Sequence, residues 1–402
     1  MPIGYLVTVA LMAWCTLFAL APPHPRHSSP SNLSYWFGYL VNELPFVGCY
    51  WLTASTLLAF AQGDIDSPGA WLVVGLAALT ALALAVVAWR GLRAGPAVER
   101  ALGEGLGAGW RTAIDAALAA KLRRRLPWAR ILLWPFPLGR PDVERVRNIA
   151  YGDAGRRNLL DVYRHRSRPS GGPVLVYLHG GAFRSGWKSR EARPLLYRLA
   201  SQGWVCVSAN YRQSPAARFS GHHVDAKKVI AWVREHGPEY GADPAVLFVA
   251  GSSAGGHLAA LAALTPNDPH FQPGFEQVDT SVTAAICLYG YYGGLDGDRP
   301  IPSSPPGYLR ADAPPFFLAH GDRDTVVLVE DARGFVEQLR RASSNPVVFA
   351  ELPGAQHGFD LFGSIRFETV VDGIEAFTAW VRSRVLARPA SIDRDPPQAN
   401  AK

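Results

Sequence analysis

The sequence predicts an α/β fold: a doubly wound, mostly parallel sheet preceded by an all-α N-terminal transmembrane region. Between about residues 143 and 388, short Val-rich apolar runs alternate with segments of helical spacing, an order typical of a parallel sheet covered on both faces. Before residue 91, three apolar stretches each approach the ~18–20 residues that cross a bilayer as a helix. The chain is 49% hydrophobic and only 18% charged, a low charged share for a purely soluble protein.

The N-terminal region, residues 1–90, contains expected spans over about 3–20, 44–61 and 70–89. Arg26 follows the first span, two aspartates follow the second, and an Arg-rich segment follows the third. Because positively charged loops prefer the cytoplasm, this pattern predicts a multi-pass protein of the cell membrane whose N-terminus lies outside and whose C-terminal domain is cytoplasmic. A cleaved signal peptide is an alternative for the first stretch, but it lacks a basic start and Pro22 occupies the cleavage position. A buried soluble helix is an alternative for the second.

Residues 91–142 are expected to form a basic, helical, membrane-proximal linker. Residues 90–147 hold 12 Lys or Arg and 5 Asp or Glu, which accounts for the formal net charge of +7. Leu118, Leu122 and Leu126 have helical spacing beside the run 123–125 of arginines, and Pro127 ends or kinks that helix. The helix lies either on an anionic lipid leaflet or against the catalytic domain, and the pattern favours neither. No nucleic-acid motif accompanies the basic residues, so membrane lipids are the expected partner.

The catalytic domain is expected over residues 143–388. Its expected strands cover 173–178, 204–209, 246–250, 284–290, 315–321 and 347–352, with a helical segment after all but the fourth. In such sheets ligands bind beyond the carboxyl ends of the strands. A Gly- and Pro-rich segment at about 291–315 is expected to form a short cap, and the polar tail 389–402 is expected to be disordered.

A candidate nucleophile lies between the expected strand 246–250 and a helix that is expected to start near Gly256. The letters GSSAG, residues 251–255, fit G-x-S-x-G with Ser253 at the centre. Gly251 and Gly255 lack Cβ atoms and let strand and helix close around a strained turn. The helix N-terminus behind the turn supplies free N–H groups and a positive dipole end.

A serine nucleophile needs a base, and the base needs a carboxylate to hold it. His357 lies in a loop after the strand 347–352, with small neighbours. The loop "AHGDRDTVV" offers Asp324 as this carboxylate; Asp322 is the alternative, and its expected role is to shape the turn. Four other histidines are interpreted as structural: His222, His223, His257 and His320.

The negative oxygen that forms during attack needs backbone N–H donors. The loop "HGGAF", beginning at His179 and Gly180, follows the strand 173–178 and can offer two donors, while Ala254 can offer a third. His179 is expected to brace this loop. The four cysteines show no metal or redox spacing, and apolar packing is their expected role: Cys15, Cys49, Cys206 and Cys287.

With these motifs in place, residues 146–384 resemble the α/β-hydrolase esterases of the hormone-sensitive-lipase and carboxylesterase group. The spellings "HGGAF" and "GSSAGGHLAAL" are most similar to the isoprenylcysteine-methylesterase-like branch, and the whole layout is similar to membrane-anchored bacterial Lip-type carboxylesterases. The resemblance implies a triad of Ser253, Asp324 and His357, and an oxyanion hole of Gly181, Ala182 and Ala254. Two departures are Ala182 in place of a third glycine and Leu328 where relatives carry proline.

We therefore expect a membrane-anchored serine carboxylesterase that works through an acyl-enzyme, with no metal or organic cofactor, on a small-molecule or lipid ester. An amidase, formamidase or acyltransferase with the same triad is the alternative, and a catalytically dead membrane scaffold is a third hypothesis.

Overall fold

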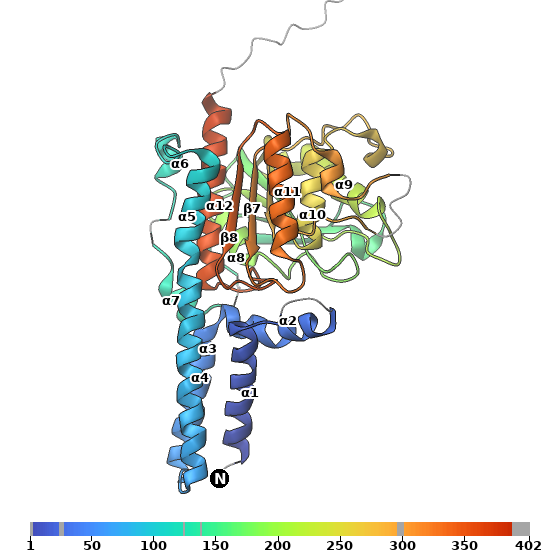
Figure 1. Cartoon of the computed structure of the whole chain (residues 1–402). Helices are drawn as coiled ribbons and strands as arrows, with labels where there is room; N and C mark the ends of the chain where they lie inside the picture. Colours follow the sequence, from blue (N-terminus) through green and yellow to red (C-terminus); the bar gives the residue numbers. More distant parts are fainter. Residues whose placement is uncertain (1–2, 24–27, 124, 137–138, 296–300, 388–402) are drawn as a thin grey trace, which may run out of the picture.

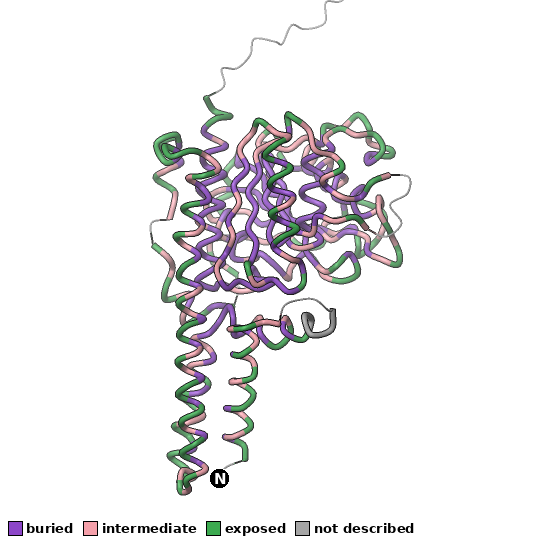
Figure 2. The backbone as a smooth tube through the Cα atoms, in the orientation of Figure 1, coloured by how far each residue is buried: buried purple, intermediate pink, exposed green. Residues whose placement is uncertain are grey.

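The computed structural model describes residues 3–23, 28–123, 125–136, 139–295 and 301–387. It shows an α/β domain standing on a narrow stalk of helices (Figure 1). Buried residues concentrate in the sheet and in the helices that cover it, whereas much of the stalk surface is exposed (Figure 2). The predicted tail 389–402 and part of the predicted cap, residues 296–300, lie outside the described residues.

Eight strands form one sheet in the order β1-β2-β4-β3-β5-β6-β7-β8. The first two pairs in this order are antiparallel, and every pair from β4–β3 to β7–β8 is parallel. The sheet is therefore mostly parallel, as predicted. The strands are β1 Val143–Ala150, β2 Leu159–His165, β3 Gly172–Leu178, β4 Val205–Ala209, β5 Ala242–Ser252, β6 Ala284–Leu288, β7 Phe316–Gly321 and β8 Val347–Leu352.

Helices cover both faces of the sheet, because alternate side chains of the central strands are apolar on either side. One face carries Leu175 and Tyr177 of β3 and packs against α5, α8 and α12. The other carries Val174 and Val176 of the same strand and packs against α9, α10 and α11. These helices are α5 Ala94–Leu106, α8 Arg193–Ala200, α9 Gly221–His236, α10 Ala254–Leu264, α11 Val329–Ala342 and α12 Ile365–Ala387.

The stalk consists of α1 Ile3–Leu20, α3 Pro45–Ala61 and α4 Pro68–Leu92. Helices α1 and α4 are each long and apolar enough to cross a membrane, and α3 becomes a third candidate when it is taken together with α2 Ser28–Glu43, from which it bends by 84°. Helix α2 has no counterpart among the predicted elements. It runs across the top of the stalk, beneath the α/β domain (Figure 1).

The predicted linker helix through Leu118, Leu122 and Leu126 is wrong in extent. Among the described residues of this segment, helix α6 covers Ala116–Ala119, and the next helix is α7, Trp128–Leu133. Of the two interpretations of this segment, the structure favours docking on the domain, because the Arg123 guanidinium pairs with Glu368 at 2.5 Å and with Asp372 at 2.6 Å.

Helix α5 belongs to the domain core although it precedes the predicted boundary at residue 143. A Cβ on Gly373 of α12 would lie 2.4 Å from Cγ1 of Val98, and a Cβ on Gly105 would lie 2.9 Å from Cα of Val348 in β8. Such contacts allow no gap between α5, α12 and the edge strand. The core of the domain therefore begins near Ala94.

Candidate active site

Ser253 occupies a sharp turn between β5 and α10. Its backbone has φ 54° and ψ −119°, a strained conformation for a residue with a side chain. A Cβ at Gly251 would lie 2.1 Å from the carbonyl oxygen of Gly255, and one at Gly255 would lie 2.0 Å from that of Leu178. Only glycine fits at both positions, so the sequence pattern enforces the turn that exposes the Ser253 hydroxyl.

The structure brings Ser253, His357 and Asp324 together from three strand ends. The His357 Nε2 atom lies 2.9 Å from the Ser253 Oγ, and its Nδ1 lies 2.7 Å from Oδ2 of Asp324. The imidazole is thus placed between a hydroxyl and a carboxylate, in the order that a general base and its orienting acid require.

Asp324 is buried and held from several sides. Its Oδ1 accepts hydrogen bonds from the backbone N–H groups of Val326 and Val327 at 2.8 and 2.9 Å, and the Nε2 of His320 lies 3.3 Å from Oδ2. Burial alone would raise the pKa of Asp324, but His357 and His320 outweigh it and hold that pKa well below its usual value. The carboxylate is therefore an anion throughout the physiological range.

Asp322, the alternative acid, points elsewhere. Its Oδ1 accepts a hydrogen bond of 2.6 Å from the backbone N–H of Gly354, and burial raises its pKa. It fixes the loop after β8 and does not contact His357 in the described structure.

The glycine-rich loop after β3 lies directly against the serine. A Cβ on Gly180 would lie 3.1 Å from the Cβ of Ser253. Ala182 has φ 53°, and Gly181 has φ 125° with its position closed to any side chain by the carbonyl of Ser185. Within the described part of the chain, the N–H groups of Gly181, Ala182 and Ala254 donate no hydrogen bond, which leaves them available to an oxyanion.

His179 stays at the base of this loop. Its Nδ1 lies 2.6 Å from the carbonyl oxygen of Gly180, and its ring stacks on Tyr211 with centroids 4.5 Å apart. Burial lowers the pKa of His179 to about 4, so the ring is neutral. The other histidines are also packed: His222 lies 2.8 Å from the carbonyl of Arg212, and His223 lies 2.9 Å from the hydroxyl of Thr265.

A buried acidic cluster beneath the turn was not foreseen. The Glu191 Oε2 atom accepts the Gly180 N–H at 2.5 Å, and Asp360 Oδ2 accepts the Ser252 hydroxyl at 2.6 Å. The Tyr177 hydroxyl lies between the two carboxylates, 3.5 Å from Glu191 and 3.2 Å from Asp360, and Tyr289 donates to the other oxygen of Asp360. The cluster thus ties the glycine-rich loop, the serine turn and the His357 loop to one another.

Two further contacts around His357 also escaped sequence reasoning. The Gln356 side chain accepts hydrogen bonds from the backbone N–H of Thr325 at 2.7 Å and of His357 at 2.9 Å, so it joins the loops of the acid and the base. The ring of Tyr289 packs against His357 with centroids 4.5 Å apart. The one available signal was the presence of acidic and amide residues in otherwise apolar stretches near the motifs.

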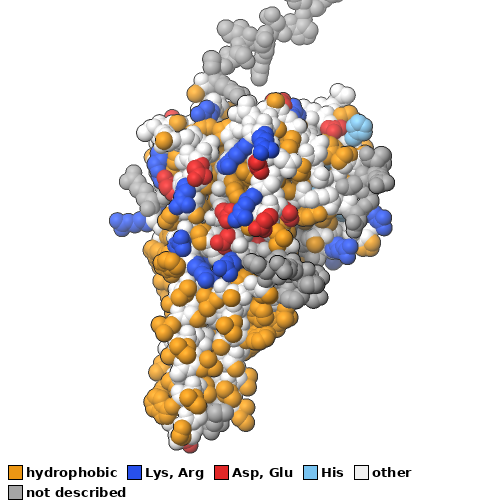
Figure 3. All heavy atoms as spheres, viewed as in Figure 1, with side chains coloured by type: hydrophobic (Ala, Val, Ile, Leu, Met, Phe, Trp, Pro, Cys, Tyr) orange, Lys and Arg blue, Asp and Glu red, His pale blue; other side chains and the backbone are white. Residues whose placement is uncertain are grey.

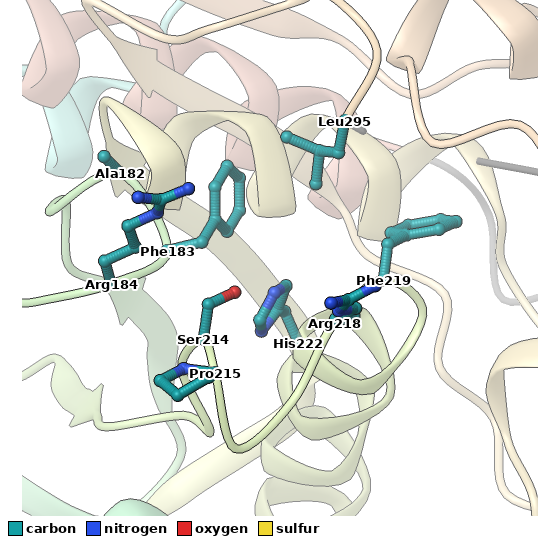
Figure 4. Close-up of a pocket in the computed structure, with 9 residues that line it drawn as sticks. All are labelled: Ala182, Phe183, Arg184, Ser214, Pro215, Arg218, Phe219, His222 and Leu295. Atoms are coloured by element: carbon teal, nitrogen blue, oxygen red, sulfur yellow. The ribbon is translucent and has the colours of Figure 1, made fainter. Parts of the chain in front are cut away.

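A cavity of about 580 Å³ opens beside the glycine-rich loop (Figure 4). The cavity is lined by Ala182 of that loop, and the ring of Phe183, also in its lining, contacts His257 of α10, four residues after Ser253. Its lining combines apolar and basic side chains: Ala182, Phe183, Arg184, Ser214, Pro215, Arg218, Phe219, His222 and Leu295. Among the described residues of the predicted cap, Leu295 alone lines this cavity. Among the described residues, no cluster of three or more His, Cys, Asp or Glu is arranged to hold a metal ion.

Comparison with known sequences identifies relatives along nearly the whole chain. The BD-FAE family profile matches residues 160–293. The probable carboxylic ester hydrolase LipM of Mycobacterium tuberculosis is 40% identical over 94% of this chain and 93% of its own length. Esterase LipQ of the same organism is 40% identical over 63% of this chain and 66% of its own length.

Comparison with solved structures agrees on the fold. Thermogutta terrifontis esterase 2, in a form phosphoramylated by tabun, superposes with a TM-score of 0.52 at 26% identity and covers 60% of this chain and 96% of its own. Its propionate-bound form superposes with a TM-score of 0.51 at 27% identity and covers 62% of this chain and 96% of its own. Each match covers about as many residues as the α/β domain contains.

Proposed function

The chain belongs to the α/β-hydrolase carboxylesterases of the hormone-sensitive-lipase group, and from that premise we propose that it cleaves carboxylic esters through Ser253, His357 and Asp324 while anchored in a membrane. The observation that carries the proposal is the continuous hydrogen-bonded chain from the Ser253 Oγ through His357 to Asp324. The backbone N–H donors that would bind the oxyanion belong to Gly181 and Ala182 of the adjacent loop and to Ala254, the first residue of α10.

In the first half-reaction, His357 Nε2 takes the Ser253 proton as Oγ attacks the ester carbonyl carbon. The anionic Asp324 stabilises the resulting imidazolium and fixes the tautomer that leaves Nε2 free as the base. The carbonyl oxygen becomes negative and accepts hydrogen bonds from the N–H groups of Gly181, Ala182 and Ala254. Each such donor contributes roughly 3–4 kcal/mol to lowering the barrier.

When the tetrahedral intermediate collapses, the C–O bond to the alcohol breaks and His357 returns its proton to the departing alkoxide. Water then enters, gives a proton to His357 and attacks the acyl carbon of the Ser253 ester. The second collapse releases the carboxylic acid and restores the serine hydroxyl. The cavity next to Ala182 and Phe183 can hold one of the two substrate groups.

The experiment that tests this proposal compares Ser253→Ala with Ser344→Ala, an exposed serine remote from the motifs. With p-nitrophenyl butyrate as substrate, we expect kcat of the first variant to fall by roughly 10⁴-fold or more and that of the second to match the wild type. Retained turnover in Ser253→Ala would exclude this serine as the nucleophile.

The membrane part of the proposal rests on the stalk. Apolar side chains cover its surface, and Lys and Arg side chains gather where it meets the domain (Figure 3). The start of α1 and the turn at 62–67 lie together at the far end (Figure 1), as a three-span arrangement requires. By the positive-inside rule, the basic end of α4 supports a cytoplasmic location for the domain. Alkaline carbonate washing should leave the protein in the membrane pellet, and release into the supernatant would contradict the anchoring.

A further inference from the structure

The loop that carries His357 packs directly on α2, the helix that crosses the top of the stalk. The Tyr35 ring meets the His357 ring edge-on with centroids 6.0 Å apart, and Tyr39 stacks on Phe362 at 6.2 Å. The Glu43 carboxylate, at the end of α2, accepts a hydrogen bond of 2.7 Å from the Ser364 hydroxyl. The serine site is therefore at the end of the α/β domain that faces the stalk.

Helix α2 lies at the level where the apolar helices end. The Arg90 guanidinium near the end of α4 donates to the carbonyl of Leu20, the last residue of α1, at 2.8 Å. A Cβ on Gly38 of α2 would lie 3.2 Å from the backbone of Phe18, so α2 rests on the end of α1. Its 84° bend from α3 directs it across the stalk axis. If the stalk crosses a bilayer, α2 lies along the bilayer surface.

The outer face of α2 is apolar and exposed. Leu33, Trp36, Phe37 and Leu40 follow one another at the i, i+3, i+4, i+7 spacing of a single helix face, and Trp36 is 63% exposed. The opposite face carries Tyr35 and Tyr39, which pack on the His357 loop. This amphipathic pattern is typical of a helix that lies in the membrane interface.

A second exposed apolar segment lies on the other side of the same loop, at and after α7. Leu133, Trp134 and Phe136 are all at least half exposed, and the Phe136 ring meets Phe362 with centroids 6.0 Å apart. Figure 1 shows α2 and α7 on different sides of the top of the stalk. We call the two segments together the apolar collar: Leu33, Trp36, Phe37, Leu40, Leu133, Trp134 and Phe136.

Resting on the function proposed above, we infer that the collar sits in the interface of the bilayer and that the substrates are esters of bilayer-resident amphiphiles, which reach Ser253 from the membrane side. The occupant of the collar is lipid, because the collar continues into the exposed apolar surface of the stalk: Phe37 stacks on Phe18 of α1 with ring centroids 6.2 Å apart, and the neighbouring Leu17 is exposed. A second copy of the chain would cover one side of the stalk and leave the other exposed. Exposed Trp and Leu at this depth favour the headgroup region over water.

The test uses the full chain reconstituted in vesicles of phosphatidylcholine and phosphatidylglycerol. It compares 4-methylumbelliferyl oleate, which resides in the bilayer, with the water-soluble 4-methylumbelliferyl butyrate. Two collar variants are measured, Trp36→Ser/Leu40→Ser and Leu133→Ser/Trp134→Ser. The matched control, Val385→Ser/Leu386→Ser, removes exposed apolar side chains at the far end of α12.

We expect the wild type to cleave both esters. Each collar variant should lower the ratio of oleate to butyrate turnover by about tenfold, because the loss of apolar area weakens insertion of the collar into the membrane interface. The control should keep the wild-type ratio. Butyrate turnover without oleate turnover in the wild type, or an unchanged ratio in both collar variants, would overturn the inference and leave the esterase proposal standing. Absence of turnover with either ester in the wild type would instead count against the proposed function.

A second measurement covers the case in which a collar variant fails to fold. Brominated phosphatidylcholine quenches tryptophans that lie at the acyl-chain boundary. We expect Trp36→Phe to reduce the quenched fraction of wild-type fluorescence while keeping the apolar face. An unchanged quenched fraction in Trp36→Phe places Trp36 outside the bilayer and overturns the inference.

Discussion

The two ring nitrogens of His357 have different partners, and this difference defines the chemistry at the residue scale. One nitrogen faces an anion that two backbone N–H groups and a second histidine hold in place, and the other faces a hydroxyl on a strained turn. The arrangement needs Asp324 to remain charged and His357 to keep one tautomer. Asp322, two residues away, satisfies a backbone group of a different loop.

The first prediction separates these two aspartates. Asp324→Asn should lower kcat for p-nitrophenyl butyrate by roughly 10³–10⁴-fold, because the amide favours the wrong tautomer of His357 and cannot stabilise its cation. Asp322→Asn should lower kcat by less than about tenfold, since it perturbs only the loop at Gly354. If the two variants lost activity equally, Asp324 would not be the orienting acid.

The second prediction concerns Glu191. Burial, followed by the charge of Asp360, raises the pKa of Glu191 to about 8, while the unfolded value is about 4.3. Because the folded pKa is the higher one, the folded state gains stability from this proton below about pH 4.3 and loses that gain as the pH rises through 8. Tyr177, Asp360 and Arg190 face the same carboxylate.

Glu191→Gln keeps an acceptor for the Gly180 N–H but removes the titration. The melting temperature of the wild type should therefore fall more steeply than that of the variant between about pH 5.5 and pH 8.5. Parallel melting profiles for the two proteins would show that Glu191 does not retain a proton when folded.

The residues with motif spellings could be predicted from the sequence, and the residues that support them could not. The turn at Ser253 depends only on Gly251 and Gly255, which lie within two positions of it, so its pattern can be found in the sequence. Glu191 and Asp360 meet only because β3, β5 and β6 place Tyr177, Ser252 and Tyr289 side by side. Nothing in one sequence gives such a register in advance.

At the scale of elements, α2 and α12 are joined by a buried ion pair. The Arg366 guanidinium, 1% exposed, pairs with Glu43 and also donates to the carbonyl of Pro353 at 3.4 Å. Removing one charge of such a pair leaves the other buried and uncompensated, which is more costly than the pair itself is stabilising. This contact fixes the His357 loop to the top of the stalk.

The third prediction uses this pair. Glu43→Gln should destabilise the protein by about 3 kcal/mol and lower the melting temperature in detergent. Glu99→Gln breaks an exposed pair with Arg111 and should change the free energy of unfolding by less than about 1 kcal/mol. If both variants changed the free energy of unfolding equally, the buried pair of Glu43 and Arg366 would stabilise the protein no more than an exposed ion pair does.

The six parallel strands, β3 to β8, were predictable as elements, whereas the antiparallel strands β1 and β2 and the helices α2 and α5 were not. Val-rich runs such as that of β3 are apolar at every position, as a strand buried on both faces requires. Helix α5 contains Gly95, Gly103 and Gly105, which lower helix propensity, and it forms because its apolar face packs on α12 and β8. Helix α2 begins with polar residues, and most of its apolar face is exposed, so the sequence shows no run of buried residues that would mark it as an element.

At the scale of the whole molecule, the stalk and the α/β domain share one continuous structure. Helix α4 passes through a single residue, Arg93, into α5, and α5 lies in the core beside α12. The basic segment after the stalk binds the domain through Arg123 as well as giving the chain its net charge. The sequence alone divides this region at residue 143, because charge and composition change there while packing does not.

The fourth prediction follows from that continuity. A chain shortened to begin at residue 143 should aggregate, since it exposes the apolar surface of α12 and β8 that α5 covers. A chain that begins at Gly91 keeps α5 and should give a folded α/β domain with native-like circular dichroism in detergent. A soluble, cooperatively melting protein from residue 143 would show that α5 is dispensable to the core.

The central claim is that the hydroxyl of residue 253 is the reacting nucleophile, and the most direct measurement is the site of covalent labelling. The full-length protein in detergent is treated with a fluorophosphonate, digested and analysed by peptide mass spectrometry. The account predicts a single adduct on Ser253, with Ser252 unmodified and with labelling strongly reduced in Asp324→Asn. An adduct on another residue, or no adduct in a protein that still cleaves p-nitrophenyl butyrate, would contradict it.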